Sequence, residues 1–400
     1  MDHSIQVVCR QPTRGDGAPR RFGLETARAV RRFHSSFPEY SPTPLVRLKE
    51  LAARLGVAEL YVKDESRRFG LNAFKVLGGS WCIGRYIAGR LGIPPEELTY
   101  ERLVSPATRA ELGGLTFVTA TDGNHGRGIA WTAARLGVDS VVYMPKGSAR
   151  ERLENIRALG AKAEITPWNY DDTVRFASRQ AEEQGWVLVQ DTSWEGYEEI
   201  PGWIMEGYTT LALEAVEQLG DARPTHIFLQ AGVGAMAGAA AGFFAGCYGQ
   251  DGPAITIVEP HNANCMFRTA RAEDGKLHSV TGDLDTIMAG LACGEPCPIA
   301  WEILDACARN FLSVPDCIAA QGMRILGNPL GADPRIISGE SGAVTAGLVT
   351  EIMRREELAP LREQLGLGRD SVILCISTEG DTDRENYRSI VWDGKYPGGS

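Results

Sequence analysis

The sequence lacks several features that would place it in a specialised class of protein. It has no excess of positive charge, because 41 Lys and Arg face 51 Asp and Glu, for a formal net charge of −10. Such a balance does not suit a surface that binds nucleic acid or an anionic membrane. The most apolar stretch of small residues, 235–247, is too short and too rich in glycine to cross a bilayer. The N-terminus lacks the apolar stretch of a signal peptide, so we expect a cytoplasmic protein without nucleic-acid or membrane partners.

Clustered cysteine is also missing. The nine cysteines are scattered and odd in number, which disfavours a secreted disulfide framework. Cys293 and Cys297 are the one close pair, but their spacing is not that of a zinc knuckle and no histidine cluster accompanies them, so we predict no metal site. Cys265 and Cys293 are candidates for a redox-sensitive pair, although buried free thiols are the preferred interpretation.

The composition that is present indicates a globular α/β protein. A chain of 400 residues is too long for one small core and suits two lobes, and 44% hydrophobic and 23% charged residues are ordinary for such a protein. Strand-like apolar runs alternate with helical patterns, which is typical of parallel sheets with right-handed crossovers. The predicted strands are residues 60–63, 115–120, 140–144, 163–166, 186–190, 226–229, 255–258 and 372–376. The predicted helices are residues 24–34, 48–56, 76–91, 127–137, 149–159, 170–184, 206–219, 301–308 and 342–355.

A chain of this length suits two lobes. We expect a large lobe from residues 1–85 and 205–400, and a smaller lobe from residues 86–204. Residues 1–40 are interpreted as an N-terminal arm with one helix, and residues 92–114 as a polar insertion to which no chemistry is assigned.

Lys75 occurs in Asn72-Ala73-Phe74-Lys75, at the start of the predicted helix 76–91. A lysine at this position is most often an ordinary surface residue. Here Phe74 precedes it and Gly78 follows it, so an apolar and closely packed setting is predicted. A partly desolvated lysine beside the positive end of a helix has its neutral form favoured, as Schiff-base formation requires.

Three further polar segments follow predicted strands. The first contains Thr121, Asp122, Gly123, Asn124 and His125, and in isolation its Gly-Asn pair would be read as an ordinary turn. The second contains Gly232, Val233, Gly234, Ala235 and Met236, where backbone amides at a helix start suit a phosphate; the alternative is a dinucleotide site with Glu259 as the ribose ligand.

The third segment is Ser377-Thr378, for which a helix cap is the competing interpretation. Asp191 also ends a predicted strand, where a capping or salt-bridged role is nearly as well supported. The carboxyl ends of parallel strands meet at one edge of a sheet, so these polar groups are expected to converge on one ligand.

Together these motifs resemble the tryptophan-synthase-like group of pyridoxal-phosphate enzymes, fold type II, and within it the diaminopropionate ammonia-lyases. The resemblance extends from Ser41 to the C-terminus. It implies two lobes, each with a mostly parallel sheet flanked by helices, and a homodimer. It also implies that pyridoxal 5′-phosphate is bound to Lys75 as a Schiff base. It further implies that Phe74 binds the cofactor and that Asn124 lies beside its phenolic oxygen. Ser377 or Thr378, with Ser377 preferred, is expected to face the pyridine nitrogen. The residues expected around the phosphate are Gly232, Val233, Gly234, Ala235 and Met236.

The same resemblance implies a small amino-acid substrate and three catalytic residues, Lys75, Asp122 and Asp191. The substrate carboxylate is expected on the loop of Thr121, Asp122, Gly123, Asn124 and His125, with His125 more structural than basic. Fold type II enzymes usually carry a hydroxyl residue at the position of Asp122. A carboxylate there repels a bound carboxylate unless the substrate brings an extra positive charge, as the β-ammonium of a 2,3-diamino acid does.

The predicted activity is therefore elimination of ammonia from D- or L-2,3-diaminopropionate, which yields pyruvate and two ammonia. A serine or threonine dehydratase is the first alternative, and Asp122 counts against it. A β-replacement enzyme similar to cysteine synthase and a non-catalytic, regulatory protein that binds pyridoxal phosphate are the others.

Overall fold

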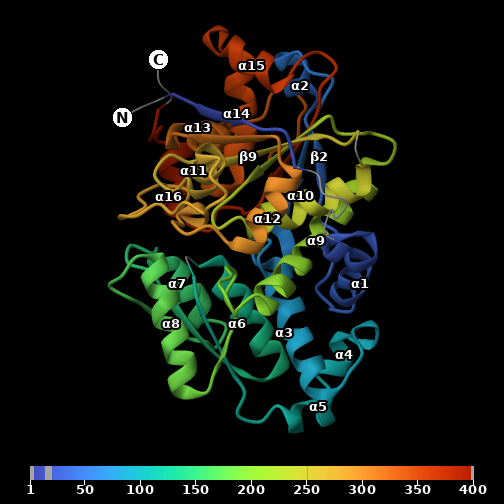
Figure 1. Ribbon diagram of the computed structural model, residues 1–400, viewed down its shortest axis with the longest axis vertical. Coiled ribbons are helices and arrows are strands. Elements are labelled where there is room, and N and C mark those ends of the chain that lie inside the picture. The colour runs from blue at the N-terminus through green and yellow to red at the C-terminus, as the bar shows by residue number, and fades with distance from the viewer. Residues whose placement is uncertain (1–3, 14–19, 122, 250, 398–400) are drawn as a thin grey trace.

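The computed structural model describes residues 4–13, 20–121, 123–249 and 251–397. It contains a seven-stranded sheet of order β1-β10-β9-β8-β11-β3-β2 and a four-stranded sheet of order β6-β5-β4-β7, drawn in the upper and lower parts of Figure 1. The strands are β1 (Gln6–Cys9), β2 (Leu45–Arg47), β3 (Glu59–Asp64), β4 (Thr116–Ala120), β5 (Asp139–Met144), β6 (Lys162–Ile165), β7 (Val187–Leu188), β8 (His226–Gln230), β9 (Ala254–Pro260), β10 (Asn310–Val314) and β11 (Val372–Ser377).

Neighbouring strands are parallel except at the two edges of the larger sheet, where β1 pairs with β10 and β2 with β3 in antiparallel fashion. The α/β fold is confirmed. The sequence patterns missed β1, β2 and β10. The two edge strands have four and three residues, too few to show a periodicity, and polar Asn310 and Ser313 interrupt the apolar run of β10.

Helices cover both sheets. They are α1 (Leu24–Ser35), α2 (Lys49–Leu55), α3 (Val76–Leu91), α4 (Tyr100–Leu103), α5 (Pro106–Glu111), α6 (Asn124–Leu136), α7 (Arg150–Arg157), α8 (Tyr170–Gln184), α9 (Glu199–Leu219), α10 (Ala235–Tyr248), α11 (Cys265–Ala272), α12 (Pro298–Cys307), α13 (Asp316–Gly327), α14 (Glu340–Arg354), α15 (Ala359–Leu365) and α16 (Arg384–Val391). No helix in the described ranges is long and apolar enough to cross a membrane.

Two of the helices, α3 and α8, coincide with their predicted bounds, and the polar segment 92–114 contains structure that the sequence patterns did not predict. It contains the short helices α4 and α5, whose first turns are capped by the side chains of Thr99 and Ser105. Short helices of four and six residues leave no clear 3.6-residue pattern, so sequence periodicity could not show them.

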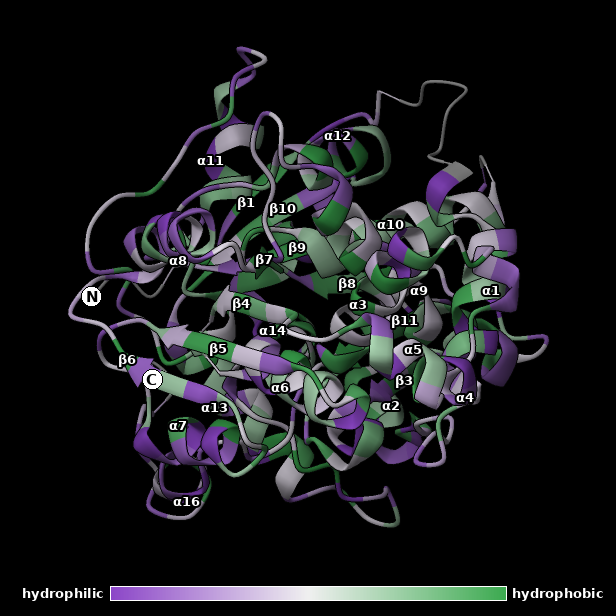
Figure 2. Cartoon of the chain, turned by 90° about the horizontal axis from the view of Figure 1, so that it is seen from below, coloured by the Kyte–Doolittle hydropathy of each residue, from purple (hydrophilic) through white to green (hydrophobic). Residues whose placement is uncertain are grey.

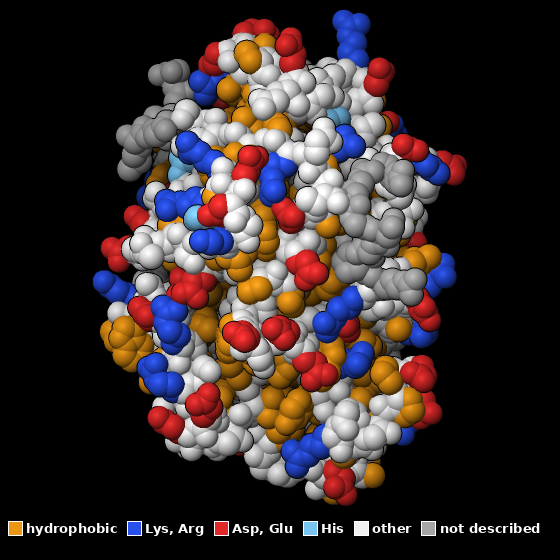
Figure 3. Space-filling model, viewed as in Figure 1, with side chains coloured by type: hydrophobic (Ala, Val, Ile, Leu, Met, Phe, Trp, Pro, Cys, Tyr) orange, Lys and Arg blue, Asp and Glu red, His pale blue; other side chains and the backbone are white. Residues whose placement is uncertain are grey.

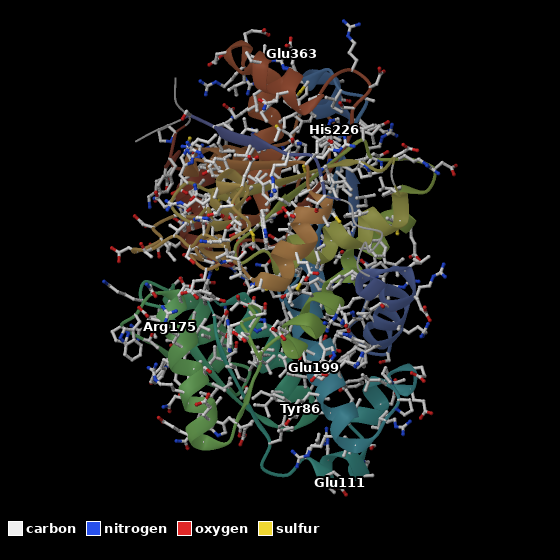
Figure 4. The ribbon with its side chains drawn as sticks, viewed as in Figure 1. Tyr86, Glu111, Arg175, Glu199, His226 and Glu363 are labelled. Carbon is white, nitrogen blue, oxygen red and sulfur yellow. The ribbon has the colours of Figure 1, made fainter. Side chains whose placement is uncertain are left out.

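The apolar interior follows the two sheets. Figure 2 shows mostly apolar strands at the centre and hydrophilic residues on the outer helices α7 and α16. On the face drawn in Figure 3, acidic and basic side chains are interspersed. Arg175 lies on α8 beside the smaller sheet, and His226 begins β8 of the larger sheet, as Figure 4 shows.

Helix α3, which begins directly after Lys75, is held by unusually close helix contacts. A Cβ added to Gly78 would lie 2.6 Å from Cε1 of Tyr208 on α9, and a Cβ on Gly207 would lie 2.4 Å from the carbonyl oxygen of Leu77. On the side of α6, a Cβ on Gly128 would lie 2.8 Å from Cα of Val76. Glycine therefore allows α3 to pack against both neighbours, which fixes the position of the lysine at its start.

A buried ion cluster holds the segment that precedes Lys75. The Arg68 guanidinium contacts Glu65 at 2.8 Å and Glu214 of α9 at 2.7 Å, and Lys63 contacts Glu214 at 2.7 Å. These four side chains are 0–1% exposed. Loss of one partner would leave a charge buried without its counter-ion, so the cluster ties this segment to α9.

Candidate active site

One cavity lies where the carboxyl ends of strands from both sheets meet. The segments after β4, β7, β8 and β11 all contribute to its wall. The lining residues that the sequence predicted are Phe74, Lys75, Thr121, Asn124, His125, Asp191, Gly232, Val233, Gly234, Ala235, Met236 and Thr378. Gly123 and Ser377 are not part of this lining, and Asp122 lies outside the described residues.

Lys75 forms the N-cap of α3, and its side chain contacts Asp191 in the wall of the cavity. Its Nζ lies 2.5 Å from Oδ2 of Asp191, and the two side chains are 18% and 3% exposed. The Tyr170 hydroxyl donates to Oδ1 of Asp191 at 3.1 Å. Burial raises the pKa of Asp191, but the charge of Lys75 and these hydrogen bonds outweigh burial and hold the pKa well below its usual range. The cavity thus contains a lysine ammonium beside an ionised carboxylate.

The turn that carries Lys75 is joined to the segment after β11. The backbone N–H of Phe74 donates to the carbonyl of Thr378 at 3.1 Å, and that of Gly380 donates to the carbonyl of Asn72 at 2.9 Å. Two segments about three hundred residues apart in the sequence are therefore fixed relative to each other at the wall of the cavity.

The loop after β4 is ordered by its own side chains. Thr121 Oγ1 accepts from the backbone N–H groups of Gly123 and Gly126, at 2.9 and 3.2 Å. Asn124 Nδ2 donates to Glu379 at 2.5 Å, which uses one of its two amide hydrogens. His125 Nε2 donates to the carbonyl of Val189 at 2.8 Å, as expected for a structural histidine.

The glycine turn after β8 has the shape of an anion cradle. Gly234 has φ = +96° and caps α10, and a Cβ there would lie 2.3 Å from Cε of Met266. A Cβ on Gly232 would lie 3.2 Å from Sγ of Cys293. The positive φ and the close contact require glycine at position 234, and the start of α10 lies in the wall of the cavity that contains Lys75, where its backbone amides could hold a phosphate. This arrangement fits pyridoxal phosphate.

The acidic residue that a dinucleotide site would need, Glu259, is not available to a ligand in the cavity. Glu259 is fully buried and accepts from the backbone N–H groups of Met266 and Phe267, at 2.9 and 2.6 Å. It therefore holds the start of α11, and it is not among the residues that line the cavity.

The preference for Ser377 over Thr378 has to be reversed. The Ser377 hydroxyl donates to Oγ of Ser338 at 2.8 Å and is fully buried away from the cavity, whereas Thr378 lines it. Successive side chains of an extended segment point to opposite sides, so only one of the two hydroxyls can face the ligand.

Sequence reasoning gave no role in the site to the lining residues Tyr170, Tyr208, Gln230, Ala231, Ala237, Gly290, Leu291 and Glu379. Glu379 accepts from Asn124 and from the backbone N–H of Ser341 at 3.2 Å. Its place directly after Thr378 was the available signal. Residues such as Tyr208 lie within a helix and carry no motif, so nothing in the sequence marked them.

Cys265 and Cys293 lie next to the glycine turn, and both are buried and not joined by a disulfide. Cys265 Sγ donates to the carbonyl of Gly232 at 3.7 Å.

Comparison with known proteins agrees with this geometry. Residues 37–377 match the family described as pyridoxal-phosphate dependent enzyme. The chain is 51% identical over 377 residues to the diaminopropionate ammonia-lyase of Escherichia coli strain K12, covering 94% of this chain and 93% of that protein.

Crystal structures of the same kind of enzyme have this fold. The holo diaminopropionate ammonia-lyase of Escherichia coli superimposes with a TM-score of 0.93 at 47% identity, over 100% of both chains. Its complex with an aminoacrylate-PLP azomethine intermediate gives a TM-score of 0.91 at 47% identity, over 99% of this chain and 98% of that one. The chain therefore belongs to the pyridoxal-phosphate-dependent enzymes of fold type II and, among them, to the diaminopropionate ammonia-lyase family.

Proposed function

We propose that the protein eliminates ammonia from 2,3-diaminopropionate, in its D or L form, and that water then hydrolyses the released aminoacrylate to pyruvate and a second ammonia. The observation that carries this proposal is the Lys75–Asp191 pair, 2.5 Å apart, in a cavity whose wall also contains the glycine turn 232–234. It gives the cofactor an attachment point and a phosphate site, and it gives the reaction a base with a counter-ion.

Pyridoxal phosphate, when bound, would supply the electron sink that acidifies the substrate Cα–H. Phe74 and the turn 232–236 would hold the cofactor, and the second amide hydrogen of Asn124 is available for its phenolic oxygen. The loop 121–125 would bind the substrate carboxylate through its backbone amides. Thr378 would place its hydroxyl at the pyridine nitrogen.

Lys75, once displaced from the cofactor by the substrate amine, would take the Cα proton and become an ammonium. Asp191, which is ionised, would stabilise that charge as its counter-ion. The β-amino group is a poor leaving group unless protonated. The proton that Lys75 gains from Cα could be transferred to the β-amino group, and this transfer would return Lys75 to its neutral form for the next cycle.

Asp122 would serve the enantiomer that Lys75 cannot reach. In this proposal Lys75 would take the proton from one face of the bound substrate, and the Asp122 carboxylate would act as the base for the opposite face. Its negative charge would also pair with the β-ammonium, which favours diamino acids over serine. The proposal also includes a division into lobes of residues 1–85 with 205–400 and of residues 86–204, a homodimer, and a cytoplasmic location.

A pyruvate-formation assay with D- and L-diaminopropionate, serine and threonine tests the substrate class. We expect diaminopropionate to be preferred, and Lys75→Ala to abolish turnover and the visible absorption of lysine-bound cofactor. Borohydride reduction followed by peptide mapping should place the cofactor on Lys75. Preferred turnover of serine or threonine would return the assignment to a dehydratase, and a cofactor on another lysine would contradict the proposed site.

A further inference from the structure

Gln230, the last residue of β8, lines the cavity but has no role in the proposed chemistry. It is 2% exposed. Its Nε2 donates to the carbonyl oxygens of Ser341 at 3.0 Å and Ile376 at 2.9 Å, and it contacts Oγ1 of Thr378 at 3.1 Å. Its Oε1 is buried without a hydrogen-bond partner in the described part of the chain.

These contacts fix the orientation of the amide. Turning it over would place Oε1 against two backbone carbonyl oxygens and lose both hydrogen bonds, which is unfavourable for buried groups. The NH₂ group of Gln230 must therefore face Thr378. An amide NH₂ can only donate, so the hydroxyl of Thr378 cannot donate in that direction.

The hydroxyl proton of Thr378 consequently points elsewhere. Within the described part of the chain, Oγ1 of Thr378 is in contact with Nε2 of Gln230, and Thr378 lines the cavity. We infer that Gln230 is a positioning residue that makes the Thr378 hydroxyl a hydrogen-bond donor to the ligand in this cavity. The inference rests on the proposed function, in which that ligand atom is the pyridine nitrogen.

A hydroxyl fixed as a donor selects the unprotonated ring nitrogen, because only the unprotonated nitrogen can accept. An unprotonated ring is a weaker electron sink, which favours elimination over transamination. Gln230 would thus determine the outcome of the reaction without touching the substrate.

The test uses holoenzyme reconstituted with pyridoxal phosphate labelled with ¹⁵N in its ring, whose NMR shift reports protonation. In Gln230→Met the pH at which the nitrogen protonates should rise by about one unit, a tenfold change in that equilibrium, because one donor hydrogen bond is lost. The fraction of cofactor converted to the amine form per turnover should rise with it. Gln230→Glu, which can accept the Thr378 proton, should shift the nitrogen in the same direction.

Four further variants separate a positioning role from general damage to the fold. Thr378→Val should give the same shift, and adding Gln230→Met to it should give no further shift, because both act through one hydroxyl. Thr378→Ser should retain the wild-type signal. Asn310→Leu removes another buried amide, which donates to Thr256 Oγ1 at 3.1 Å and is not part of the cavity lining, and it should leave the ring nitrogen unchanged.

Two results would overturn the inference and leave the proposed function supported by wild-type elimination. One is an unchanged nitrogen signal in Gln230→Met. The other is that Gln230→Met shifts the pH of nitrogen protonation as much in Thr378→Val as it does in the wild type. Failure of the wild type to bind the cofactor at Lys75 would contradict the proposed function instead. Loss of folding in both Gln230 variants would assign the residue to the core and also overturn its positioning role.

Discussion

Replacing Asp191 by Asn asks whether this carboxylate is the counter-ion of Lys75 or the acid that protonates the leaving amine. Oδ2 of Asp191 is 2.5 Å from Nζ of Lys75, and Oδ1 accepts from Tyr170 at 3.1 Å. An Asn that keeps the Tyr170 bond through its oxygen must turn its NH₂ toward the ammonium, so two donors would face each other. The reverse orientation leaves the Tyr170 hydroxyl without its acceptor.

The expected loss follows from this geometry. A hydrogen bond to a charged group contributes about 1.5–3 kcal/mol, which corresponds to roughly a tenfold to 150-fold fall in kcat/KM. A residue that also donated the proton to the leaving group would contribute a further factor of about 10²–10⁴. Because Lys75 and hydrogen bonds hold the pKa of the buried Asp191 well below its usual range, we expect only the first, smaller loss.

The assay compares diaminopropionate with β-chloroalanine, whose chloride leaves without a proton. If Asp191 is the counter-ion of Lys75, Asp191→Asn lowers kcat/KM for both substrates by the same factor. A loss about a hundredfold larger for diaminopropionate would refute this reasoning and make Asp191 the acid. Tyr170→Phe is the matched control, since it removes one hydrogen bond to the carboxylate and leaves its charge, and it should cost less.

Gly234→Ala should weaken cofactor retention during dialysis, because its Cβ would lie 2.3 Å from Cε of Met266, and Gly234→Asp should weaken it more by adding charge repulsion. Equal retention in wild type and both variants would move the phosphate site elsewhere. Asp122→Asn should lower turnover of D-diaminopropionate far more than that of the L form; equal losses would indicate a shared substrate anchor. Glu340→Gln tests pH dependence, because burial and the charge of Glu379 raise the pKa of Glu340 from 4.5 to about 7. Between these pH values the unfolded chain loses a proton that the folded protein keeps, so stability should fall by about 3 kcal/mol as pH rises. The free energy of unfolding, measured with urea at pH 5 and pH 8, should differ less between the two pH values in Glu340→Gln than in the wild type. An equal difference in both proteins would exclude Glu340 as the source of the pH dependence.

The sequence determined the features that depend on local pattern. The period of apolar residues predicted α3 and α8 at their observed bounds, because each buries one continuous face. Asn124 and the turn 232–236 could be assigned to one ligand because each directly follows an apolar strand of a parallel sheet, and such strands present their ends together. Lys75 was assigned to the same ligand from its motif at the start of α3.

Only the tertiary structure decided which side chains touch. It chose Thr378 over Ser377, because the direction of each side chain depends on how β11 packs against its neighbours. It joined the turn of Lys75 to residues 378–380 and placed Asp191 beside the lysine amine. It also brought Gln230 to Thr378, a contact between residues 148 positions apart that carries no signal along the chain. Local propensities act over a few residues, whereas these contacts are set by the packing of whole helices and sheets.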